Sequence, residues 1–162
     1  MRVSRLILLF LVSVFICQSL YFYSQMPNEM ATHFGIDGRA NGWMSKQFSL
    51  FFDIGLLLLF LGISFGIPRL TEKMGDSFIN LPNKNYWLAK DKRNDTFQYF
   101  RNRFEWLGVG LLMLLNMISW TIFQANLGEN QRLPSVIWLF LFAFVCFVVV
   151  WVITLNRKFH KT

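Results

Sequence analysis

The sequence predicts an all-α integral membrane protein, a four-helix bundle that forms one membrane domain over residues 1–162. Three observations predict it. Hydrophobic residues make up 54% of the chain and aromatic residues 18%, whereas charged residues make up only 15%, which is unusual for a soluble domain. The charged residues are confined to a few intervals. Four stretches are apolar for long enough to cross a bilayer, and a helix satisfies all its backbone polar groups in such a stretch.

The predicted spans cover residues 6–23, 48–67, 106–123 and 136–155. Each has about 18 to 20 residues, which at about 1.5 Å per residue matches a hydrocarbon core of roughly 30 Å. Four tryptophans lie near the predicted ends, where amphipathic rings prefer to sit: Trp43, Trp87, Trp106 and Trp138.

Basic residues predict the orientation. Of the 16 Lys and Arg residues, two precede the first span, eight lie in the inner segment, residues 68–105, and three follow the last span. The remaining three lie in the other two connections. Because basic loops stay in the cytoplasm, we expect both termini inside and the outer loop, residues 24–47, outside. Attraction of the basic residues to anionic lipid headgroups explains the net charge of +7. We therefore expect the lipid bilayer as a partner and do not expect nucleic acid.

The inner segment is predicted to contain a helix. Phe97, Phe100 and Phe104 recur at helical spacing, with Asp95 and Glu105 on the opposite face. Two interpretations are open: an amphipathic interfacial helix between spans two and three, or a cytoplasmic extension of span three. We prefer the interfacial helix, because phenylalanines beside a bilayer have an apolar neighbour.

Small residues in span two predict a close helix contact. Gly62 and Gly66 form a G-x-x-x-G pattern, and Gly55 lies seven residues earlier on the same face. Contact within this bundle is the preferred interpretation, and a homo-oligomer is the alternative.

Asp53 is the only ionisable side chain well inside a predicted span, where a carboxylate needs a partner or a proton. Lys46 lies two turns earlier on the same helix, and Gln18 is expected at a similar depth. We expect an outer polar cluster of these three residues, with His33 as a further candidate. The alternative is a structural hydrogen bond or contact with interfacial water, and whether Asp53 is charged stays open.

The outer loop is the most distinctive stretch. Its glycines and Pro27 predict tight turns that fold it over the bundle with His33 and Phe34 turned inward. The candidate ligand or partner contacts are His33, Phe34, Asp37, Gly38, Asn41, Trp43, Lys46 and Asp53. One His and one nearby Asp are too few ligands for a metal, and no Ser or Cys nucleophile has a partner. We therefore expect no metal, no cofactor and no catalytic residue.

The same loop resembles a known family. Its motif is P-x-x-x-x-x-H-F-x-x-x-G-x-x-N-G-W-x-S-K, carried by Pro27, His33, Phe34, Gly38, Gly42, Trp43, Ser45 and Lys46. This pattern resembles domain of unknown function 1648, a bacterial membrane module that also begins the SdpI-like toxin-immunity proteins. The resemblance covers roughly residues 6–67 and implies a multi-pass protein of the bacterial cytoplasmic (inner) membrane. The family often has Asp at the position of Asn41.

Three classes of function follow. The leading hypothesis is a non-enzymatic protein whose outer loop, centred on His33 and Lys46, recognises a ligand or protein partner in an immunity or envelope-stress role. The basic inner segment is a second surface for a partner. The alternative is transport of a small ion or solute through an oligomer using Asp53. An enzyme using His33 as acid or base ranks last, because no orienting residue is evident.

Overall fold

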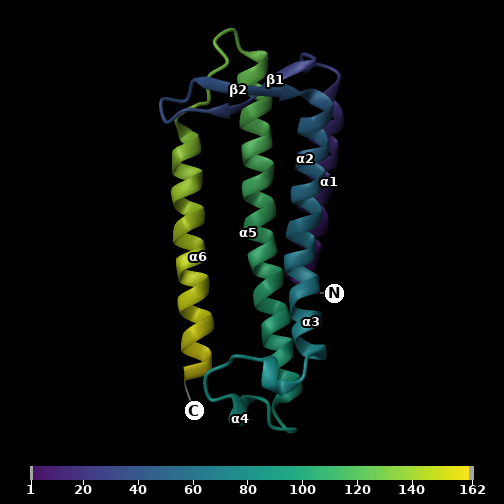
Figure 1. Cartoon of the computed structure of the whole chain (residues 1–162), viewed down its shortest axis with the longest axis vertical. Helices are drawn as coiled ribbons and strands as arrows, with labels where there is room; N and C mark the ends of the chain where they lie inside the picture. The colour runs from purple at the N-terminus through teal and green to yellow at the C-terminus, as the bar shows by residue number, and fades with distance from the viewer. Residues whose placement is uncertain (1, 161–162) are drawn as a thin grey trace.

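Four long helices and one β-hairpin make up the computed structural model, which describes residues 2–160 (Figure 1). The long helices are α1 (Val3–Tyr23), α2 (Lys46–Leu61), α5 (Arg93–Leu127) and α6 (Val136–His160). α2 continues through a π-helical turn, Gly62–Gly66, into α3 (Ile67–Lys73), so that one helix of 28 residues results. By length and composition, four helices of the described chain can cross a membrane. The all-α fold class is confirmed.

The helix α5 is the centre of the bundle. Figure 1 shows it between α6 on one side and α1 and α2 on the other. Its residues Val109, Leu112 and Leu115 form the main apolar core with Leu8 and Phe15 of α1. The helix α6 packs chiefly against α5. The bundle therefore depends on α5 to connect its parts.

The phenylalanine stripe, Phe97, Phe100 and Phe104, does not belong to an interfacial helix, so the preferred interpretation was wrong. No separate interfacial helix precedes span three, because α5 runs unbroken for 35 residues and the stripe lies on its first turns. No Gly or Pro interrupts the chain between Arg93 and Trp106. The phenylalanines are covered by protein, since Phe97 is buried in a cluster with Ile79 and Leu88, and the Phe104 ring lies 5.3 Å from that of Trp151 in α6. The alternative, an extension of span three, describes the structure.

The rest of the inner segment folds across the inner end of the bundle. It contains a 3-10 turn, Asp76–Phe78, and the short helix α4 (Lys84–Trp87). The indole Nε1 of Trp87 donates to the carbonyl of Phe159 at 3.1 Å, which ties this segment to the end of α6. Figure 1 shows α4 at the end of the bundle opposite the hairpin.

Glu105 holds α1 to α5 near this inner end. Its buried carboxylate accepts hydrogen bonds from the Ser4 hydroxyl at 2.7 Å and from Arg5 Nε and Nη2 at 2.9 Å. Arg2 Nη1 lies at 3.3 Å. The sequence placed Glu105 on a polar helix face but gave no sign of partners about 100 residues away.

The glycines of span two do not make the expected contact within the bundle. A Cβ built at Gly55, Gly62 or Gly66 would have no neighbour within 4 Å. The close approach is at Gly108 of α5, where a Cβ would lie 1.9 Å from the Ser64 hydroxyl. Ser64, within the π-helical turn, is buried and is the residue of span two that lies against Gly108. Association of two copies through these glycines stays a prediction.

Candidate functional site

The outer loop folds into a two-stranded antiparallel hairpin at one end of the bundle (Figure 1). Its strands are β1 (Glu29–Phe34) and β2 (Ala40–Ser45). The sequence predicted the turns but not the strands. A Cβ at Gly42 would lie 2.9 Å from the Cβ of His33 on the opposite strand, so only glycine allows the two strands to pair this closely here. Ser45 ends the hairpin and caps α2 by accepting the Phe48 amide at 3.3 Å.

Asn126 of α5 fixes the hairpin to the bundle. Its Oδ1 accepts from the Ala31 amide and its Nδ2 donates to the Ala31 carbonyl, both at 2.8 Å. Ala31 is fully buried, and beside it Met26 and Met30 pack on Phe22 and Phe123 of the helices. Two backbone groups that strand pairing leaves unpaired are thus satisfied by one side chain.

Lys46 has a structural position at the base of the hairpin. Its amide donates to the Asn28 carbonyl at 3.0 Å, and its Nζ donates to the Met26 carbonyl at 3.4 Å. The ammonium also lies 5.2 Å from the centre of the Tyr23 ring. Lys46 therefore joins the hairpin to the ends of α1 and α2.

The tip of the hairpin rests on the loop between α5 and α6. Gly38 has a φ of 78°, and a Cβ there would lie 3.0 Å from the Leu133 carbonyl. The Leu133 amide donates to the Gly38 carbonyl at 2.9 Å, and Arg132 Nε donates to the Asp37 carbonyl at 3.2 Å. We call residues 29–45 together with 131–133 the outer platform. It is fastened at its base, middle and tip.

The outer platform exposes several large side chains. His33 is exposed, Ile36 has 89% of its surface exposed, and Trp43 has 49%. The Arg39 side chain is 77% exposed. His33 Nδ1 lies 2.5 Å from Asn41 Oδ1, and Trp43 Nε1 donates to Gln131 Oε1 at 3.1 Å. Hydrogen bonds within the platform thus orient the His33 and Trp43 rings.

The expectation that His33 and Phe34 turn inward was wrong for His33, which is exposed; Phe34 is half-buried. The strand pairing is irregular between Ala31 and His33, which pair with the adjacent residues Trp43 and Gly42. Thr32 is therefore one extra residue in β1 at this point. It shifts the alternation of side chains along the strand, so that the His33 side chain is not on the buried side with that of Ala31.

The polar groups expected around Asp53 are divided between separate places. Asp53 accepts a hydrogen bond from the Ser119 hydroxyl at 3.3 Å. Gln18 instead donates to Asn116 Oδ1 at 3.2 Å. Lys46 and Asp53 line the same small cavity, of about 10 Å³, which is room for about one water molecule. The cavity also borders Ser19, whose buried Oγ has no hydrogen-bond partner.

No group of three His, Cys, Asp or Glu side chains within residues 2–160 is placed to hold a metal ion.

Comparison with known proteins gives one match. Residues 6–63 match the family model described as Domain of unknown function (DUF1648). No curated protein matches the chain, and neither does any solved structure. Asn126 and residues 131–133, which fasten the platform, lie outside the matched residues. The matched residues hold most of α1, the hairpin and α2, so this part of the chain is similar to the DUF1648 domain family.

Proposed function

We propose that this chain is a non-enzymatic, multi-pass protein of the bacterial inner membrane whose outer platform recognises a ligand or protein partner in immunity or envelope stress. The observation that carries the proposal is a fastened hairpin with exposed His33, Ile36, Arg39 and Trp43 side chains. A surface that is rigid before binding loses less conformational entropy when a partner arrives. Tryptophan and arginine are also the residues that contribute most often to binding energy.

The roles of the motif residues support this proposal. Gly38, Gly42 and Ser45 are explained by backbone conformation, strand contact and helix capping. Lys46 is explained by its bonds at the base of the hairpin. His33 and Trp43 have side chains that face solvent and contact only other platform residues through hydrogen bonds. These two rings are therefore the motif side chains that we assign to partner contact.

Photo-crosslinking in cells tests the proposal. A photoreactive amino acid replaces Ile36 at the platform or, as a control, Phe78 at the opposite end of the bundle, which is 75% exposed. We expect a discrete adduct from position 36 that disappears when His33→Ala and Trp43→Ala are added. Adding Glu129→Ala instead, a change at an exposed position outside the platform, should leave the adduct unchanged. No adduct from position 36, or one unaffected by the two platform changes, contradicts the proposal.

Transport of a small ion or solute is the second candidate function. What favours it is the cavity bordered by Asp53, Lys46 and the unpartnered Ser19 hydroxyl, because such groups in lipid often mark an ion pathway. The cavity is too small for a hydrated path in one chain, so an oligomer would be needed. Ion flux into proteoliposomes that is the same for wild type and Asp53→Asn would eliminate this candidate.

A further inference from the structure

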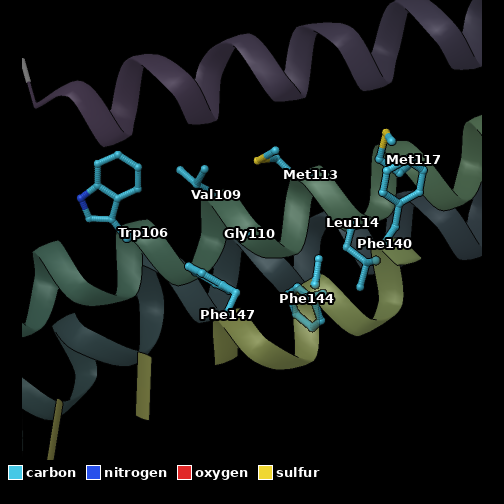
Figure 2. A pocket seen from close by; sticks show the side chains of 10 residues that line it. Trp106, Val109, Gly110, Met113, Leu114, Met117, Phe140, Phe144 and Phe147 are labelled. Carbon is cyan, nitrogen blue, oxygen red and sulfur yellow. The ribbon is translucent and has the colours of Figure 1, made fainter. Parts of the chain in front are cut away.

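An apolar groove runs along the bundle between α5 and α6. Its volume is about 400 Å³. Figure 2 shows that its lining residues come from these two helices, among them Trp106, Gly110 and Met117 of α5 and Phe140, Phe144 and Phe147 of α6. The groove lies within the apolar parts of both helices. It is therefore at the depth of the lipid chains.

The groove adjoins a second cavity of about 260 Å³, nearer to the inner end of the bundle. Trp106 and Phe147 line both cavities, and the second one adds Arg103, Trp151 and Thr154. From Arg103 to Met117 the helix α5 rises about 21 Å at 1.5 Å per residue. One leaflet of a bilayer has a hydrocarbon thickness of about 15 Å, half of the roughly 30 Å core. The groove and the adjoining cavity together are long enough for one acyl chain with its headgroup at Arg103.

Arg103 places a positive charge at the inner end of this groove. Its Nη2 donates to the Trp151 carbonyl at 3.2 Å and to the Thr154 hydroxyl. Its Nε is buried without a hydrogen-bond partner. Among residues 2–160 no carboxylate pairs with Arg103, whereas Arg5 pairs with Glu105 and Arg101 with Glu72. The charge of this guanidinium is left uncompensated beside an apolar groove.

We propose that the groove between α5 and α6 binds one anionic phospholipid of the inner leaflet, with an acyl chain along the groove and its phosphate at the Arg103 guanidinium. Guanidinium groups form strong charge-assisted hydrogen bonds with phosphate oxygens. The basic inner segment adds a positive field that favours a lipid of net negative charge over a zwitterionic one. This site is independent of the outer platform.

Native mass spectrometry of the full chain in detergent tests the site. The probes are phosphatidylglycerol and phosphatidylcholine with identical acyl chains. We expect one tightly bound phosphatidylglycerol and weaker binding of phosphatidylcholine. Arg103→Gln should weaken phosphatidylglycerol binding at least about ten-fold, the value of one charge-assisted hydrogen bond. Arg157→Gln, which removes an exposed charge at the end of α6, should change it little.

A second pair of variants keeps Arg103 and its contacts with α6. Ala143→Phe fills the groove from its lining, and Val145→Phe adds the same ring at a position that is 58% exposed and does not line the groove. We expect Ala143→Phe to release the lipid and Val145→Phe to leave it bound. Equal binding of the two lipids, or binding unchanged by both Arg103→Gln and Ala143→Phe, overturns the proposal. So does a dimer without bound lipid that Ala143→Phe separates, because the groove would then hold a second copy.

Discussion

The Asn126→Ala substitution should release the outer platform from the bundle while leaving the helices folded. It removes the two 2.8 Å hydrogen bonds to the backbone of Ala31, a residue with no exposed surface. Each buried backbone group left without a partner costs about 1–3 kcal/mol, so the two together cost about 2–6 kcal/mol. The strand can avoid this cost only by separating from α5 and admitting water. We therefore expect local opening of the hairpin rather than unfolding of the bundle.

Hydrogen exchange of the purified protein measures this opening. A loss of at least 2 kcal/mol corresponds to exchange of the Ala31 amide that is about 30-fold faster or more. Amides in the middle of α5 should exchange as in the wild type. Gln124→Ala is the matched control, because Gln124 is an exposed residue of the same helix two positions away. Unchanged protection of Ala31 in Asn126→Ala, or equal deprotection in both variants, would refute the assignment of Asn126 as the main attachment.

Three further predictions concern stability in detergent. Gly108→Ala should lower the free energy of unfolding by about 1–3 kcal/mol, because its Cβ overpacks against the π-helical turn. Gly62→Ala should not lower it, because its Cβ meets open space. Thermal unfolding of the two variants measures the difference. Gly38→Ala should cost about 1–2 kcal/mol, because its positive φ is strained for other residues, and faster proteolysis of the hairpin tip would reveal it. Glu105→Gln should cost about 1–3 kcal/mol by weakening hydrogen bonds from partly exposed arginines. Asp91→Asn, an exposed control, should leave the melting temperature unchanged.

The helices could be predicted from the sequence because a bilayer requires an uninterrupted apolar stretch, and such a stretch consists of consecutive residues. An apolar run such as 136–155 has one physical outcome in a bilayer, a helix, and no distant residue is needed to predict it. The inner phenylalanines show the limit of the same reasoning. Their spacing predicts an apolar helix face, but periodicity cannot say whether lipid or Trp151 and Ile79 cover that face.

The contacts of the candidate residues could not be predicted from the sequence. The motif residues from His33 to Ser45 lie on the platform, and Lys46 lies at the base of the hairpin. The irregular pairing after Ala31, which exposes His33, depends on backbone contacts that no residue type signals. Asn126 and Glu105 were missed because their partners lie 95 and about 100 residues away. The contact of the span-two glycines was predicted wrongly because the spacing of small residues along one helix does not say which of its faces meets α5, where Ser64 approaches Gly108.

Labelling of single cysteines in intact cells tests most directly the claim that these helices cross a membrane with the platform outside. Cys17 and Cys146 are first replaced by serine, and Ile36→Cys or Asn85→Cys, both at exposed positions, is then introduced. A maleimide that cannot cross membranes should label position 36 in intact cells and position 85 only after permeabilisation. Labelling of both positions from the same side of the membrane would contradict the account.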